Sequence, residues 1–217
     1  MQGHDAGQRA DRLLAAPLGR ATSGRLVIEP AAAHLTVSGD PVMTDLYRAS
    51  FESPAPTVRV KGGTVTVHYQ RMAWLTDLRA LLGPPPSGEV TLNGSIPWHI
   101  RVRGGTAHTS FDLGDLVLYA LELGGGASQV ELILPAPAGT VPVRVAGGVH
   151  DLTILRPAGV AARVQVGHGA RGLTLDDQHF GAIGGGTRWQ SPGYDQTGDR
   201  YDIAVSGGAD ALTLATG

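Results

Sequence analysis

The chain has 217 residues, with 32 glycines, 14 prolines and no cysteine, and hydrophobic residues make up 42% of it. Its net charge is −2 and its 17 basic residues are scattered, so it lacks the basic cluster that nucleic-acid binding needs. The absence of cysteine excludes disulfides, thiolate catalysis and cysteine-ligated zinc. The length and the many turn-forming residues favour one large all-β domain.

The first 22 residues precede the repeated pattern described below. Residues 10–16 (ADRLLAA) are compatible with a short helix that caps the first strands. We therefore predict an N-terminal segment, residues 1–22, followed by one β-domain, residues 23–217. The N-terminal stretch contains no apolar run long enough for a signal peptide or a membrane span, so we expect a cytoplasmic protein.

Short triplets with apolar residues at both ends recur from residue 26 onward. The first triplets of the repeated units are Leu26–Ile28, Val58–Val60, Ile100–Val102, Leu121–Leu123, Val143–Val145, Val164–Val166 and Ile203–Val205. The second triplets are Leu35–Val37, Val65–Val67, Val130–Leu132, Leu152–Ile154, Leu173–Leu175 and Leu212–Leu214. In five units the second triplet begins nine residues after the first. This alternation predicts strands with one buried face, and the glycines between triplets predict corners with positive φ.

A unit of about 20 residues with two short strands cannot bury its own apolar side and must stack on its neighbours. The sequence therefore predicts an all-β, single-stranded β-solenoid of short stacked coils. Stacking in chain order would place Glu122 between Arg101 and Arg144. It would also align an outward ladder of threonines: Thr36, Thr66, Thr153, Thr174 and Thr213.

One region departs from the pattern. Val90-Thr91-Leu92 is interpreted as the second strand of a degenerate unit. Before it, Met72–Leu82 (MAWLTDLRALL) fits a helix or a strand and loop, and the pattern does not decide between them.

Three stretches resemble toastrack-type β-solenoid domains: ATSGRLVIEPAAAHLTVSG, GGGASQVELILPAPAGTVPVRVAGG and VSGGADALTL. The resemblance covers roughly residues 20–217. This region is similar to the C-terminal region of LiaF-like, cell-wall-active-antibiotics response proteins of bacteria. It implies a non-catalytic platform associated with membrane segments or stress-signalling partners.

The sequence indicates no catalytic, metal or cofactor site. The densest polar clusters, His150-Asp151 and Asp176–His179, do not supply the three or four convergent ligands of a metal site. No GxSxG motif surrounds a serine, and the glycine-rich stretch GAIGGGT lacks the lysine of a phosphate-binding loop.

The leading functional hypothesis is thus a non-catalytic scaffold or protein-interaction domain of a bacterial system, with a second protein or a second copy as partner. One alternative is a carbohydrate- or cell-envelope-binding module. The other is an enzyme that acts on an extended, polysaccharide-like substrate. The candidate contact residues are aromatic residues and outward arginines: Trp98, Arg101, Arg144, Trp189 and Tyr194. For the aromatic residues, packing over the end of the solenoid is the competing explanation.

Overall fold

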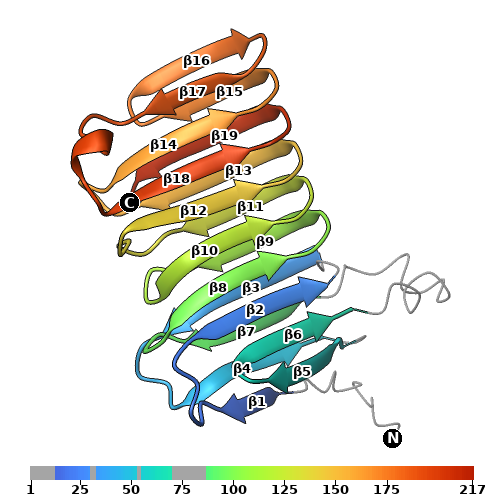
Figure 1. Cartoon of the computed structure of the whole chain (residues 1–217). Coiled ribbons are helices and arrows are strands. Elements are labelled where there is room, and N and C mark those ends of the chain that lie inside the picture. The colour runs from blue at the N-terminus through green and yellow to red at the C-terminus, as the bar shows by residue number, and fades with distance from the viewer. Residues whose placement is uncertain (1–12, 30–32, 53–54, 70–86) are drawn as a thin grey trace, which may run out of the picture.

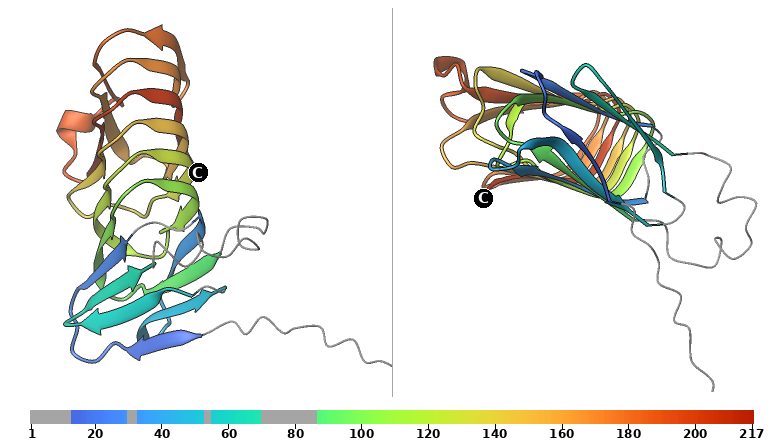
Figure 2. Two further views of the ribbon diagram at one scale, coloured as in Figure 1. Left: turned by 90° about the vertical axis from the view of Figure 1, so that its right-hand side faces the viewer. Right: turned by 90° about the horizontal axis from the view of Figure 1, so that it is seen from below.

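The computed structural model of the chain describes residues 13–29, 33–52, 55–69 and 87–217. Two β-sheets face each other and run the length of an elongated molecule (Figure 1 and Figure 2). In spatial order, sheet A contains β1 (Leu14–Pro17), β4 (Asp45–Phe51), β7 (Gly88–Asn93), β3 (Ala33–Asp40), β9 (Thr106–Asp112), β11 (Ala127–Ile133), β13 (Val149–Arg156), β19 (Ala209–Thr216), β15 (Ala170–Leu175) and β16 (Gln178–Ile183).

Sheet B contains, in the same sense, β5 (Thr57–Lys61), β6 (Thr64–His68), β2 (Gly24–Glu29), β8 (Pro97–Val102), β10 (Val117–Leu123), β12 (Thr140–Val145), β18 (Arg200–Val205), β14 (Ala161–Val166) and β17 (Thr187–Gln190). A 3₁₀ turn, η1 (Tyr194–Gln196), lies between β17 and β18. In the described ranges, no helix has the length and apolarity required to cross a membrane.

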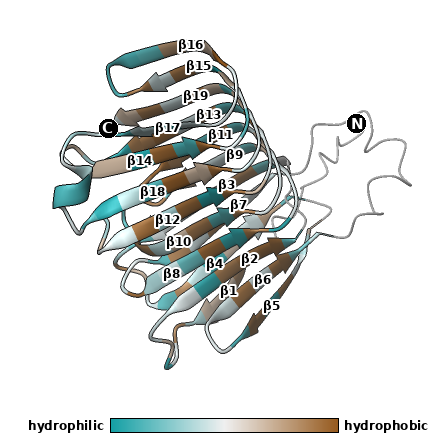
Figure 3. Ribbon diagram, turned by 45° about the horizontal axis from the view of Figure 1, so that its top comes forward, coloured by the Kyte–Doolittle hydropathy of each residue, from teal (hydrophilic) through white to brown (hydrophobic). Residues whose placement is uncertain are grey.

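The predicted all-β solenoid is confirmed. Within the described residues, seven coils each contribute one strand to each sheet, and equivalent strands of neighbouring coils pair in parallel. Inward side chains form one continuous hydrophobic core between the sheets, from Leu26 in β2 to Leu214 in β19. The alternation of hydrophobic and hydrophilic positions along the strands is visible in Figure 3. Both ends are closed by antiparallel strands: β4, β1 and β5 at one end, β16 and β17 at the other.

The coils do not stack in chain order, which corrects the simplest expectation from the repeat. The coil β2–β3 lies between β6–β7 and β8–β9. Similarly, β18–β19 lies between β12–β13 and β14–β15. The first triplets at Val164 and Ile203 begin 39 residues apart because the chain makes an excursion that forms β16, β17 and η1 before it returns into the stack.

Two local predictions need correction. The triplets Val58–Val60 and Val65–Val67 are not one coil but an antiparallel hairpin, β5–β6, within sheet B. The strand that completes the coil of β6 is β7, which contains Val90–Leu92 as expected. The segment Met72–Leu82 lies outside the described residues.

The short N-terminal helix is also wrong where it can be assessed. Leu14–Pro17 form strand β1, which pairs antiparallel with β4. Leu14 and Ala16 alternate with more exposed neighbours and pack against the core. The free edge of β4 offers backbone partners that an isolated helical turn of this length cannot supply, because helix nucleation is costly.

The glycine corners are required mainly because neighbouring coils approach closely. A Cβ added to Gly207 would lie 2.5 Å from the backbone nitrogen of Gly148, and one added to Gly147 would lie 2.6 Å from that of Gly126. Neither Gly207 nor Gly147 has a positive φ. The predicted positive φ is found at other glycines after first triplets, such as Gly62 and Gly104. At most corners glycine is therefore required because the neighbouring backbone leaves no room for a Cβ, and not because φ is positive.

A column of left-handed residues crosses sheet A. Six coils have a residue with φ between 49° and 62° at the same position, directly before the second inward strand position: His34, His108, Gln129, Asp151, Ala211 and Gly172. Side chains other than glycine, asparagine, aspartate and histidine rarely adopt this conformation. Ala211 is the least suited member of the column.

We expect Gly207→Ala to lower the free energy of unfolding by about 2 kcal/mol, since two backbones would have to move apart. Urea denaturation followed by circular dichroism measures the change. The control is Gly198→Ala, where an added Cβ meets nothing within 4 Å; its effect should stay within about 0.5 kcal/mol. Equal effects of the two substitutions would show that coil spacing does not require the corner glycine.

Ala211→Gly should raise the free energy of unfolding by about 1 kcal/mol, because glycine adopts a positive φ without steric cost. The reverse change, Gly172→Ala, should lower the free energy of unfolding by a similar amount, because alanine is strained at the positive φ of this position. The added Cβ would make only ordinary contacts, at 3.7 Å, so no clash adds to this effect. Ala204→Gly, in an extended part of β18, is the control and should be destabilising. A destabilising Ala211→Gly would contradict the assigned backbone conformation.

Candidate functional site

The outer face of sheet A carries a groove formed by two adjoining hollows. The first has a volume of about 380 Å³ and is lined by His34, Thr36, Ser50, Glu52, Ser87, Gly88, Glu89, His108 and Ser110. The second, of about 340 Å³, is lined by His108, Thr109, Ser110, Gln129, Val130, Glu131, Asp151 and Thr153. Because His108 and Ser110 line both, the two hollows form one continuous feature, called here the sheet A groove.

The floor of the groove is a row of outward side chains held in register by the sheet. The row runs through Ser50, Glu89, Thr36, Ser110, Glu131 and Thr153, each opposite the next on the neighbouring strand. It continues beyond the groove through Thr213 and Thr174. Four of the five threonines expected to form a ladder thus share one row, whereas Thr66 lies in sheet B.

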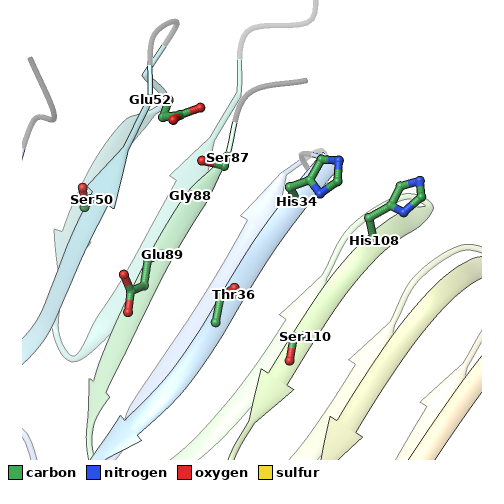
Figure 4. Close-up of a pocket in the computed structure, with 9 residues that line it drawn as sticks. All are labelled: His34, Thr36, Ser50, Glu52, Ser87, Gly88, Glu89, His108 and Ser110. Atoms are coloured by element: carbon green, nitrogen blue, oxygen red, sulfur yellow. The ribbon is translucent and has the colours of Figure 1, made fainter. Parts of the chain in front are cut away.

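The left-handed column forms one side of the groove. It directs His34, His108, Gln129 and Asp151 out of the regular pleat, next to the row of the floor. The rings of His34 and His108 stack, with centroids 4.9 Å apart and an interplanar angle of 13°. Figure 4 shows these two rings side by side above Thr36 and Ser110, with Glu89, Ser50 and Glu52 on the neighbouring strands.

Carboxylates give the groove a negative charge. Glu52, Glu89, Glu131 and Asp151 line it, and within the described ranges none of them forms an ion pair with an arginine, lysine or histidine. Their charge is therefore not neutralised by the surrounding described side chains, and the groove favours a positively charged ligand.

The outer face of sheet B is different in charge. Its carboxylates are engaged by basic side chains: Glu29 with Arg103 at 2.5 Å, Glu122 with Arg101 at 3.1 Å, and Asp202 with Arg144 at 2.7 Å. Further basic side chains lie on the same sheet, namely Arg25, Arg59, Lys61, Arg163 and Arg188. Sheet B thus presents an excess of positive charge, and sheet A an excess of negative charge.

The expected position of Glu122 is confirmed, but it forms an ion pair with only one of the two arginines. The register places it opposite Arg101 on one side and Arg144 on the other. It pairs with Arg101 and with His99, whose Nε2 is 3.0 Å from Glu122 Oε1. Arg144 instead donates to the carbonyl and the carboxylate of Asp202, because β18 rather than β14 is its neighbour.

The five residues proposed from the sequence as contacts do not meet at one place. Trp98 is fully buried, and its indole Nε1 donates to the carbonyl of Asn93 at 2.7 Å. Tyr194 is buried too, with the guanidinium groups of Arg163 and Arg200 over its ring at 4.0 and 4.6 Å.

The other three are accessible at least in part. Arg101 and Arg144 lie on the outer face of sheet B. Trp189, in the end strand β17, is half-buried against the core and donates to Gln178 Oε1 at 3.1 Å. None of the five lines the sheet A groove.

Sequence reasoning did not identify the groove. Glu131 could have been found, since it is the outward middle residue of a second triplet. His34, His108 and Asp151 could not, because alternation alone does not reveal the left-handed residue before each inward position. Across the described residues, no group of three or more histidines, aspartates or glutamates could hold a metal ion.

The family follows from comparison with known proteins. Residues 7–155 match the family model described as the N-terminal domain of toast_rack, DUF2154. The chain belongs to this family. The match confirms the toastrack resemblance. It includes every residue that lines the groove, of which Thr153 is the last in the sequence.

One solved structure shows the same fold. A crystal structure from Clostridium sporogenes, of a protein provisionally named for cell adhesion, is similar over 96% of this chain and 99% of its own, with a TM-score of 0.71 and 16% identity. A provisionally named adhesin from Bacteroides fragilis gives a TM-score of only 0.35 at 9% identity, over 96% of this chain and 98% of its own. No curated protein matches the chain.

Substitutions should separate groove carboxylates from structural ones. Glu131→Gln removes an exposed charge without an ion pair in the described structure, so the free energy of unfolding should change by no more than about 0.5 kcal/mol. Glu122→Gln weakens contacts with Arg101 and His99 and should cost up to about 1 kcal/mol. Urea denaturation measures both. A larger loss for Glu131→Gln would assign this residue a structural role.

Proposed function

We propose that the chain is a non-catalytic interaction domain that binds a positively charged segment of a partner protein along the sheet A groove. The observation that carries the proposal is the set of four groove carboxylates without ion pairs in the described structure. The toast-rack family and the neighbour named for cell adhesion support an interaction or adhesion module. A partner at the bacterial cell envelope is part of the proposal.

The charge of the groove argues for a cationic partner. A carboxylate that is held on a rigid sheet and lacks an internal counter-ion can form charge-assisted hydrogen bonds with lysine or arginine. Glu89 and Glu131 lie in the same row, separated by Thr36 and Ser110, so a partner that lies across the strands meets both. Such complementary charge speeds encounter and selects against anionic partners.

The construction of the groove argues for binding rather than catalysis. Its side chains project from paired strands of neighbouring coils, and such positions are held more rigidly than positions on loops. The lining combines carboxylates, hydroxyls and two stacked imidazoles in an open feature. An enzyme that hydrolyses polysaccharides needs two carboxyl groups on either side of a bond, in a site that positions a sugar ring.

A carbohydrate ligand is the second candidate. The hydroxyls of Thr36, Ser50, Ser87, Ser110 and Thr153 favour it, since they can donate to and accept from sugar hydroxyls. Among the described residues, the groove lining contains no tryptophan, tyrosine or phenylalanine to pack against a sugar ring. The protein partner is therefore the better supported of the two.

Capture of partners from lysate of the source organism tests the proposal, with soluble and membrane fractions analysed separately by mass spectrometry. We compare the wild type with Glu131→Lys, in the groove, and Asp177→Lys, an equal charge change at an exposed turn between β15 and β16. A groove partner should be recovered by the wild type and by Asp177→Lys. Recovery by Glu131→Lys should be at least about tenfold lower, and 0.5 M salt should reduce wild-type recovery because it screens exposed charges.

Equal recovery by all three proteins would show that the partner does not use the groove. Binding to purified cell-wall glycan fragments, insensitive to salt and lost in Ser110→Ala but not in Asp177→Lys, would favour the carbohydrate alternative instead.

A further inference from the structure

The end of the solenoid farthest from β1 finishes with two strands, one in each sheet. β16 is the last strand of sheet A and pairs only with β15, while β17 is the last strand of sheet B and pairs only with β14. Residues Gly184–Gly186 connect them, and Figure 1 shows both at the same end of the molecule. Each therefore has one edge of backbone N–H and C=O groups that no described strand pairs.

These two edges lack the features that usually prevent strands from pairing with other molecules. Such features are charged side chains, especially lysine, and proline. The sequence of β16, QHFGAI, contains no lysine, arginine, aspartate, glutamate or proline, and β17, TRWQ, has a single charge at Arg188. At the other end, the edge strand β5 carries Arg59 and Lys61, and β1 ends in Pro17. The two ends of the solenoid are thus protected to different degrees against strand pairing with other molecules.

The apolar side chains at the same end are incompletely covered. Phe180, Ile183 and Trp189 pack against the core but are only partly buried. Apolar surface between two unpaired strand edges favours contact with another ordered sheet structure.

We propose that this end is the interface of a symmetric dimer, in which β16 and β17 each pair with the same strand of a second copy. A partner that satisfies both edges at once must present two free strands separated by the distance between the two sheets. A second copy of this chain meets that requirement, because it presents the same two strands at the same separation. A two-fold axis perpendicular to the sheets brings β16 against β16 and β17 against β17, antiparallel in both cases, so that each sheet continues from one copy into the other.

The size of the contact predicts moderate affinity. Six residues of β16 and four of β17 can form up to about ten hydrogen bonds across the axis, which is close to the usual number for a protein–protein interface. The apolar contribution comes mainly from Phe180, Ile183 and Trp189, fewer residues than in a large obligate interface. We therefore expect a dissociation constant of roughly micromolar order. The groove lies on other coils, so dimerisation and partner binding are separable.

Sedimentation velocity of the full chain over about 1–200 µM tests the dimer. The double variant Gly181→Lys/Ala182→Lys places two positive charges on exposed positions of the β16 edge, and an added Cβ at Gly181 meets nothing within 4 Å. The matched control, Thr57→Lys/Val60→Lys, adds the same charges to the exposed β5 edge at the other end. We expect dimers of the wild type and of the control, and at least tenfold weaker association of the β16 variant.

A wild type that remains monomeric throughout this range would overturn the proposal. The same holds if the control dissociates as much as the β16 variant, or if the β16 variant associates as tightly as the wild type. Hydrogen exchange of the wild type at low and high concentration is independent of whether the variants fold. Backbone amides of β16 and β17 should gain protection as concentration rises, while those of β5 should not, and the reverse pattern would contradict the assignment.

Discussion

The backbone contact between successive coils is the constraint on which the rest of the structure depends. Parallel pairing fixes the spacing of coils in both sheets, and at the corners the chains approach so closely that a single added carbon at Gly147 or Gly207 would overlap the next backbone. Once this spacing is set, every coil must repeat the same sequence of inward and outward positions. The continuous core, the polar row of the groove and the left-handed column are all consequences of that repetition.

The repetition also explains how two faces of one solenoid acquire opposite character. Inward positions are restricted to apolar residues, but outward positions are restricted only by their neighbours in the row. On sheet B the neighbours are of opposite charge, as in the contact of Glu122 with Arg101, and the charges stabilise each other. On sheet A, Glu89 and Glu131 have hydroxyl-bearing neighbours, so their charge remains available for contact with other molecules.

The sequence was sufficient to predict the class of fold, because alternation and coil spacing determine which side chains face inward. It was insufficient where an inward position is not apolar. Thr109 is buried in β9, and its hydroxyl bonds that of Thr106 at 2.7 Å, so the second strand of that coil lacked the expected triplet. Trp98 was misjudged for a related reason, since its polar group is satisfied inside the molecule by the carbonyl of Asn93.

The order of coils could not be predicted either, because a repeat shows which segments are equivalent and not which are adjacent. Val143 and Val164 begin consecutive units in the sequence, yet the strand of Ile203 lies between them. That arrangement decides the charge pairs as well. Arg144 meets Asp202 only because β18 enters the stack at this point, and the groove residues were missed because their grouping depends on three-dimensional neighbours.

The insertion of β18–β19 between earlier coils determines the order in which the chain can fold. Residues 161–190 form β14–β17, but the strands of this segment pair with those of other coils only through β18–β19, made from residues 200–216. The strands β14 and β15 therefore cannot pair directly with β12 and β13, as they would if coils were added in chain order. During synthesis, this segment must therefore wait until the following 26 residues have left the ribosome, and contacts such as Arg200 with Thr140, 60 residues apart, then close the stack. We therefore expect this end to fold more slowly than a stack in chain order would, even though each coil is built from short and local strands.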